Sequence, residues 1–339
     1  MPPIKRAKSM DVAQLAGVSR TTVSFVLNNV PDVTISDATR KRVLEAAQSL
    51  NYHPNAAGRK LVSGKSRTLG LVLCQSQEQV FADSLLPQVL LGVGQAAMQV
   101  GYQVLLRPAE TSDPFSYIKT IRENFVDGIV LSGPRQDDPE ILSLYEEGFP
   151  VMLMGQLPDS DIPFVDIDAS AGAEAATNHL LERGCKRIAM ITNAPLSYTS
   201  ARQRRNGYLN ALKSAGIGFD EALLKEGNYT PESGYQAMMG LLGNGSRPDA
   251  VFVASDVVAK GAMLAAKRSG LRIPEDLAIV GFDDIPLAEY FEPPLTTVHL
   301  PAYGLGWAAG ERLIRLVQNE GLDEKGVLMQ SNLIIRESS

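Results

Sequence analysis

Apolar residues recur with one period in the first 54 residues and with another in the rest of the chain. Near the N-terminus they fall three and four residues apart in three short stretches, which places them on one face of a helix. The predicted buried faces are Val12, Leu15 and Ala16 in the first stretch, Val23, Val26 and Leu27 in the second, and Val43, Ala46, Ala47 and Leu50 in the third. This pattern predicts three short helices around a small core.

Polar and turn-forming residues mark where these helices begin and end. Gly17 supplies a left-handed turn at little cost, and Ser19 and Ser36 are residues of the type that caps a helix N-terminus. Tyr52 and Pro54 follow the third helix and end it. Two short helices around a tight turn, followed by a third, predict a helix-turn-helix unit.

From residue 68 onward, short apolar runs alternate with longer helical patterns. The runs form two sets, 68–74, 102–106, 128–131 and 151–154 in the first, and 164–167, 187–192, 250–254 and 277–282 in the second. The helical patterns include 84–100, 170–183, 201–215, 256–269 and 302–319. This alternation is typical of α/β proteins with parallel sheets, and two comparable sets predict two similar subdomains.

Charge separates the same two parts of the chain. The 339 residues carry a net charge of −6, but residues 1–65 contain ten basic and four acidic residues, and the remainder contains 22 basic and 34 acidic residues. A cationic unit joined to an acidic one indicates that the first unit faces a polyanion, and the second helix could then enter the DNA major groove. The alternative is a three-helix bundle that contacts proteins.

Composition excludes several other classes of protein. No apolar run approaches the roughly 20 residues of a membrane span, and no secretory signal is present, so we expect a cytoplasmic protein. Two cysteines and three dispersed histidines predict neither a disulfide framework nor a metal site. No Walker-type loop, dinucleotide fingerprint or nucleophile elbow occurs, and nothing in the sequence brings acids such as Asp166 and Asp168 together around a substrate. We therefore predict no catalytic residue, no cofactor and no enzyme.

The N-terminal residues resemble a known family. The resemblance runs over Asp11-Val12-Ala13 through Asn28, and over Arg40-Lys41-Arg42-Val43, Asn51-Tyr52 and Pro54-Asn55. These stretches are similar to the DNA-binding domain of the lactose-repressor (LacI/GalR) family of bacterial transcription regulators, and the similarity continues through nearly the whole chain. It implies a helix-turn-helix domain at 1–54, a hinge helix and linker at 55–67, and an effector-binding and dimerisation domain at 68–339 with a fold like that of periplasmic binding protein type I.

The subdomain boundaries follow from the strand pattern and this resemblance. The N-subdomain is expected at about 68–165 and 302–329, and the C-subdomain at about 166–295 and 330–339. Ligands of such folds bind at the carboxyl ends of the strands, here in the cleft between subdomains.

The resemblance also implies which residues contact DNA. Family members read operator bases from the positions of Arg20, Thr21 and Phe25. Phe25 departs from the pattern, since arginine or histidine often stands there and phenylalanine can only make apolar contact, for example with a thymine methyl. The other implied DNA contacts are Ser19, Thr22 and Ser24, which match phosphate-contacting positions, and Asn28, which closes the recognition helix.

Residues 55–61 resemble the hinge helix of the family, in which Asn55 is the first position. Leu61 matches the leucine that wedges between base pairs. Gly58 stands where alanine is usual, and glycine costs a helix about 1 kcal/mol relative to alanine. We therefore expect Gly58→Ala to raise operator affinity. The alternative is that 55–67 is a flexible linker only.

Five effector contacts are implied for the second domain. Arg204 matches the arginine that holds effector oxygens, and Asp283 matches the acid that accepts hydrogen bonds from the ligand. Tyr229 matches an aromatic residue that covers a sugar or base face, Ser255 stands where some members have asparagine, and Phe81 lies near the usual aromatic-rich loop. These residues could also be ordinary caps, turns and surface charges. The family acid after the fourth strand is absent here, where Gly155 stands.

The function that these observations predict is a repressor that binds a palindromic DNA operator as a homodimer and is switched by a small-molecule effector, a sugar or sugar derivative. Two alternatives stay open. One is a corepressor-dependent regulator that senses a purine or nucleoside. The other is a free-standing solute-binding protein, which would have no use for residues 10–61.

Overall fold

The computed structural model describes residues 7–28, 33–52, 65–108, 116–123, 125–243 and 247–339. The chain divides into two compact units with the boundary between Ser66 and Arg67, and each unit is described here by itself. The predicted hinge residues Asn55, Gly58 and Leu61 lie outside the described residues.

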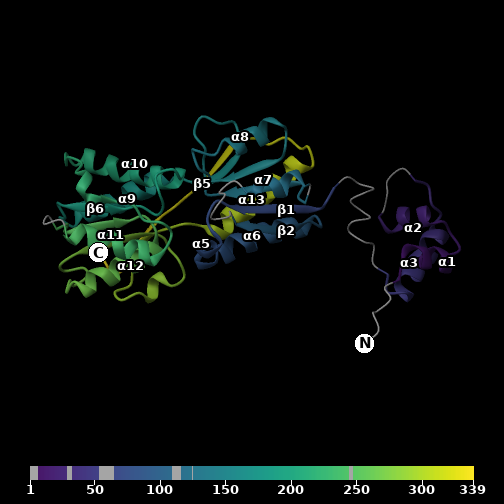
Figure 1. Cartoon of the computed structure of the whole chain (residues 1–339), viewed down its shortest axis with the longest axis horizontal. Coiled ribbons are helices and arrows are strands. Elements are labelled where there is room, and N and C mark those ends of the chain that lie inside the picture. The colour runs from purple at the N-terminus through teal and green to yellow at the C-terminus, as the bar shows by residue number, and fades with distance from the viewer. Residues whose placement is uncertain (1–6, 29–32, 53–64, 109–115, 124, 244–246) are drawn as a thin grey trace. The chain divides into compact units, whose positions relative to one another are not determined.

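The first unit contains three helices, α1 (Ser9–Ala16), α2 (Arg20–Leu27) and α3 (Asp37–Ser49) (Figure 1). The turn between α1 and α2 is made by Gly17, which has a φ of 64°, a conformation that a side chain disfavours. The Ser19 hydroxyl accepts a hydrogen bond from the Thr22 N–H at 3.0 Å, so Ser19 caps α2 as the sequence predicts.

The core of this unit differs from the predicted one in α1. Val12, Ala13 and Ala16 are the buried residues of α1, whereas Leu15 is 58% exposed. Leu15 lies three residues after Val12 but at the flank of the apolar stripe, where neither α2 nor α3 covers it. The small side chain of Ala13 instead takes the buried place, and it lets the helices approach closely.

The second unit is built on two six-stranded sheets. The first sheet has the order β11-β5-β4-β3-β1-β2 and is entirely parallel. Its strands are β1 (Thr68–Leu73), β2 (Gln103–Pro108), β3 (Gly128–Ser132), β4 (Val151–Met154), β5 (Phe164–Ile167) and β11 (Gly326–Met329). The central strands are apolar along their whole length because helices cover both faces of the sheet.

The second sheet has the order β12-β10-β9-β8-β6-β7, and only the edge strand β12 is antiparallel. Its strands are β6 (Ile188–Ile191), β7 (Leu224–Lys225), β8 (Ala250–Val253), β9 (Ala278–Asp283), β10 (Thr296–His299) and β12 (Leu333–Ile334). The two sheets with their helices form the two predicted parallel-sheet subdomains.

Pairs of helices cover the sheets. Helix α6 packs against α13, α9 against α10, and α11 against α12 (Figure 1). The helices of this unit are α5 (Gln77–Ala82), α6 (Leu86–Gln99), α7 (Tyr117–Arg122), α8 (Pro139–Glu146), α9 (Ala169–Glu182), α10 (Thr199–Ser214), α11 (Pro231–Gly243), α12 (Asp256–Arg268) and α13 (Ala302–Val317). Among the described residues, no helix is long and apolar enough to cross a membrane.

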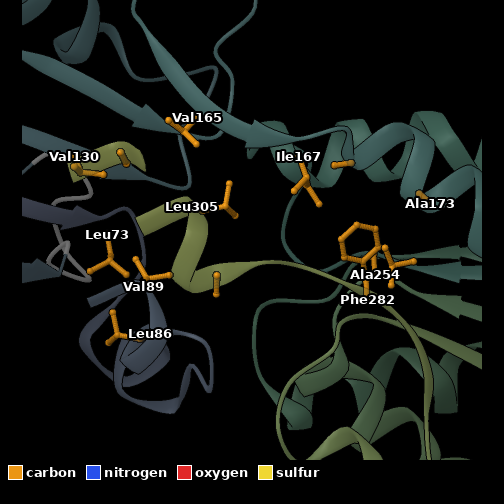
Figure 2. Close-up of a cluster of buried hydrophobic side chains, with 14 of the residues drawn as sticks. Leu73, Leu86, Val89, Val130, Val165, Ile167, Ala173, Ala254, Phe282 and Leu305 are labelled. Atoms are coloured by element: carbon orange, nitrogen blue, oxygen red, sulfur yellow. The ribbon is translucent and has the colours of Figure 1, made fainter. Parts of the chain in front are cut away.

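The assignment of β5 to the second set of strands is wrong. β5 pairs with β4 and β11, so it belongs to the first sheet. The chain crosses between the sheets after β5, after β10 and between β11 and β12. Figure 2 shows buried side chains on both sides of these crossings, with Val165 and Leu305 in the first subdomain, Ala254 and Phe282 in the second, and Ile167 at the end of β5.

Candidate functional site

One face of α2 carries the predicted DNA-contacting residues. Arg20 and Thr21 are exposed, and Phe25 is half-buried without joining the core cluster of the unit. The side-chain amide of Asn28 donates to the Ser24 hydroxyl at 3.1 Å. The structure therefore places this polar surface on a helix whose opposite side is anchored by Val23 and Val26.

The flanking hydroxyls of this face are also fixed. The hydroxyls of Ser19 and Thr22 lie 2.9 Å apart at the N-terminus of α2. A helix N-terminus has free N–H groups and a positive dipole end, which suits a phosphate. The seven predicted DNA-contacting residues of the first unit thus lie on α2 and at its two caps.

A cavity of about 1090 Å³, including space open to solvent, lies in the second unit where strands of both sheets end. Its lining comes from both subdomains. The polar lining residues are Gln75, Gln79, Asp83, Ser132, Asp166, Asn193, Thr199, Ser200, Arg204, Tyr229, Ser255 and Asp283. A site between two parallel sheets at their carboxyl edges is the usual ligand position of α/β folds.

Arg204 and Asp283 form a buried ion pair in this cavity. The guanidinium of Arg204 on α10 donates to the Asp283 carboxylate at 3.1 Å and to the Ala254 carbonyl. It also lies 3.8 Å from the centre of the Phe282 ring. Burial raises the pKa of Asp283 to about 6, although the Arg204 charge acts in the opposite direction.

Tyr229 and Ser255 line the cavity as well. Tyr229 has a φ of 58° and packs edge-on against the ring of Tyr198, with 5.4 Å between the ring centres. Burial raises the pKa of Tyr229, so its hydroxyl is a neutral donor and acceptor. Ser255 is the buried residue that precedes α12. The structure thus brings together four of the five predicted effector residues.

Phe81 is not among the cavity residues, since its side chain is 74% exposed. It lies on α5, a helix that the apolar pattern does not predict. Gln79 of the same helix faces the cavity instead, and its side-chain amide donates to the Asn228 side-chain oxygen at 3.0 Å. Gln79 and Phe81 are two residues apart on α5 and therefore point in different directions, so the cavity is lined by the amide of Gln79 and not by the ring of Phe81.

Several lining residues were missed by sequence reasoning. Asp166 was considered only as an acid with no partner, yet it accepts a hydrogen bond from the Gln156 side chain at 3.0 Å beside the cavity. Asp83 follows α5 and Asn193 follows β6, at loop positions with no motif. The alternation of apolar and polar residues in β5 could have indicated Asp166. It places Val165 and Ile167 on the buried face of the strand and Asp166 on the other face.

Gly155 also lines the cavity, and it has a φ of 118°. A Cβ atom there would lie 2.7 Å from Cδ of Pro134, so the position has no room for the acid that the family resemblance implies. Asp168, the other acid considered as half of a catalytic pair, accepts from the Ala171 N–H at 2.8 Å and caps α9. In the described part of the chain, no three His, Cys, Asp or Glu side chains could hold a metal ion.

Comparison with known families matches both units. Residues 10–55 match the model of "Bacterial regulatory proteins, lacI family", and residues 177–339 match that of the periplasmic binding protein-like domain. The HTH-type transcriptional regulator CelR of Thermobifida fusca is 36% identical over 331 residues, which cover 96% of each chain. The chain belongs to the lacI family.

Other lacI-family proteins are similar over the same length. The HTH-type transcriptional repressor CytR of Escherichia coli is 37% identical over 98% of this chain and 96% of its own. Among solved structures, a CelR–cellobiose complex has a TM-score of 0.76 at 35% identity, with 98% of this chain and 100% of that chain covered. The Lac repressor dimer bound to operator and the anti-inducer ONPF has a TM-score of 0.85 at 29% identity, with 98% and 99% covered.

These comparisons confirm the predicted family, fold class and general function. This lacI-family protein is a DNA-binding transcriptional regulator with an effector-binding domain, and it is not an enzyme.

Proposed function

We propose that this regulator is a cytoplasmic repressor that binds a palindromic operator as a homodimer and changes its DNA affinity when a sugar or sugar derivative occupies the cavity. The buried Arg204–Asp283 pair is the observation that carries the effector assignment. A planar guanidinium beside a carboxylate offers adjacent donors and acceptors, which suits the vicinal hydroxyls of a sugar.

Operator reading is assigned to the exposed face of α2. Arg20 and Thr21 would contact base edges in the major groove, and Phe25 would contact a thymine methyl. Ser19, Thr22, Ser24 and Asn28 would hold the helix in register through phosphates or a base edge. Asn55, Gly58 and Leu61 would form the hinge that enters the minor groove.

A second copy of the chain would cover an apolar surface on α6 and β2. This surface contains Leu91, Met98 and Leu105, all exposed, and β2 is the edge strand of its sheet. A shallow groove lined by Leu90, Leu91, Met98 and Tyr102 follows the same elements. The Lac repressor, with which this fold agrees over nearly its whole length, is a dimer on its operator. A dimer would also read two half-sites, which one helix-turn-helix cannot do.

Contacts across the cavity provide a means of switching. The N–H of Thr199 donates to the Pro134 carbonyl at 3.1 Å, and Gln79 donates to Asn228, so each pair joins one subdomain to the other. A ligand that bridges the same two subdomains would favour one relative orientation of them. An orientation change in a dimer alters the spacing of its DNA-binding heads, and a coupling of roughly 1–3 kcal/mol suffices for a useful switch.

A purine or nucleoside effector is the second candidate. The aromatic ring of Tyr229 in the cavity could cover a base as well as a sugar ring. A nucleoside carries a sugar, so the Arg204–Asp283 pair would serve either ligand.

Operator selection from a random DNA library tests the DNA-binding part. We expect one palindromic sequence to be enriched, and Arg20→Ala to lower the ratio of specific to non-specific affinity by about 1–3 kcal/mol per half-site. Lys41→Ala, which removes an exposed basic side chain of α3, is the matched control and should leave that ratio unchanged. No enrichment of any duplex, or equal ratios for both variants, would contradict the proposal.

A further inference from the structure

The effector cavity contains more acidic than basic side chains. Asp83, Asp166 and Asp283 line it together with a single cation, Arg204. The three carboxyl groups outnumber the one guanidinium, so potential negative charge exceeds positive charge in the cavity. This excess lies in a partly enclosed space where charge interactions are stronger than in water.

Asp83 comes from the first subdomain. It follows α5 directly, and its Oδ1 accepts from the Leu85 N–H at 2.8 Å. Burial raises the pKa of Asp83, and the charge of Asp83 in turn contributes to the raised pKa of Asp283. The two carboxylates, one from each subdomain, therefore act on each other.

Asp166 lies near the Arg204 side of the cavity. One of its oxygens accepts from Gln156 at 3.0 Å, and the other accepts from the Ile167 N–H at 2.8 Å. Burial raises the pKa of Asp166 in spite of these bonds and of the Arg204 charge. A carboxylate has about four acceptor positions, so both Asp83 and Asp166 keep capacity for further donors.

Two buried polar atoms at the cavity have no hydrogen-bond partner, an acceptor on Asn193 and a donor on Arg204. Asn193 is only 3% exposed, and its amide donates to the Ser200 hydroxyl at 3.2 Å, whereas its side-chain oxygen has no partner. Arg204 is 7% exposed, and its Nε, an N–H donor, has no partner. A buried polar group without a partner costs free energy that a suitable ligand recovers.

We propose that the effector is an uncharged polyhydroxylated molecule, a free sugar or nucleoside rather than a phosphorylated or carboxylated one, and that Asp83 and Asp166 select it by accepting hydrogen bonds from its hydroxyls. This inference rests on the proposed effector function of the cavity. A phosphate would add negative charge to a space that already holds an excess of it, and Arg204 is already engaged by Asp283. The three carboxylates do not converge on a point as metal ligands would, since no such cluster occurs among the described residues.

Thermal-shift and calorimetric titrations of the full chain with matched ligand pairs test this proposal. The pairs are glucose and glucose 6-phosphate, ribose and ribose 5-phosphate, and cytidine and cytidine monophosphate, with cellobiose added because a relative binds it. We expect an uncharged member to bind, and its phosphorylated partner to bind at least about 100-fold more weakly. The three pairs distinguish a sugar from a nucleoside.

Variants assign the selection to particular side chains. Asp83→Asn and Asp166→Asn should each lower the affinity for the uncharged sugar or nucleoside about tenfold. The double variant should reduce the difference in affinity between the uncharged ligand and its phosphorylated counterpart. Asp168→Asn, an exposed cap outside the cavity, should stay within about twofold of the parent. Retained operator binding and an unchanged melting temperature establish that each variant folds.

Three outcomes would overturn the inference. They are equal or tighter binding of a phosphorylated member, parent-like affinities of both cavity variants, and binding of none of the seven probes. Selection of an operator by the same protein preparation is measured separately, so failure of this inference can be told from failure of the proposed regulatory function.

Discussion

The Arg204–Asp283 pair should contribute to stability as a unit. In Arg204→Met, the side chain still fills space beside the Phe282 ring, but the Asp283 carboxylate loses the cation at 3.1 Å that partly offsets its burial. Removing one partner of a buried pair costs about 3–5 kcal/mol, because the other charge is left without compensation. Asp283→Asn in the Arg204→Met background removes that charge, so the double variant should recover most of the loss. The expected coupling energy is about 2–3 kcal/mol.

Urea unfolding followed by the fluorescence of Trp307 measures this cycle. Trp307 is the only tryptophan of the chain and lies on α13, so its signal reports on the second unit alone. The loss in Arg204→Met should be largest at pH 8 and smaller at pH 5, where the uncompensated carboxyl takes up a proton easily. A coupling energy below about 0.5 kcal/mol at pH 8 would refute the reasoning, because independent sites show no more than that.

The titration of Asp283 should also appear in the pH dependence of the unfolding free energy of the parent protein. The pKa of Asp283 is about 6 in the folded chain, above the 3.8 that is ordinary for an aspartate, so the folded state binds the proton more tightly. Its contribution to the free energy of unfolding is therefore present at low pH and is lost as pH rises from about 4 to 6, by about 3 kcal/mol. The difference between the parent and Asp283→Asn should follow this curve, and a difference that is constant with pH would contradict it.

Three further predictions concern assembly, closure and the hinge. Met98→Glu should raise the dimer dissociation constant about 10³-fold, as measured by sedimentation at micromolar concentration, because a charge would be buried twice in a symmetric interface. Leu142→Glu, on the exposed face of α8, should leave that constant unchanged. A dimer unchanged by Met98→Glu would exclude this surface as the interface. Gln79→Ala removes the bonds to Asn228 across the cavity and should weaken the selected sugar or nucleoside about threefold to tenfold in calorimetry, and parent-like affinity would show that this contact does not act in closure. Gly58→Ala should raise operator affinity at fixed salt, and equal affinity of the two forms would rule out a helical hinge there.

Periodicity predicts the regular parts of this fold well, because local burial determines them. The caps Ser19 and Ser36, the turn at Gly17 and the central strands all follow from residue type and spacing. The sheet to which β5 belongs does not follow, because a parallel strand can pair with any neighbour that the tertiary fold brings to it. Helix α11 was missed because its glycines lower helix propensity, yet a Cβ at Gly234 would lie 2.0 Å from the Val258 carbonyl oxygen, so close packing against α12 explains that glycine.

The lining residues of the cavity were easier to predict at the ends of strands than elsewhere. Ser255 directly precedes α12 and Asp283 ends β9, whereas Arg204 lies in the second turn of α10. Helix α5 could have been predicted from its capping box, in which Ser76 and Gln79 bond to each other's backbone. Its orientation, and with it the exposure of Phe81, depends on packing that no local pattern encodes.

A titration of the selected operator with the full chain, at fixed salt and in the presence and absence of the uncharged ligand found by thermal shift, is the most direct test of ligand-controlled DNA binding. We expect the dissociation constant for the operator to change by at least about fivefold when the ligand is saturating, while the affinity for a scrambled duplex of the same length stays the same. An operator affinity that is identical with and without bound ligand would contradict the account.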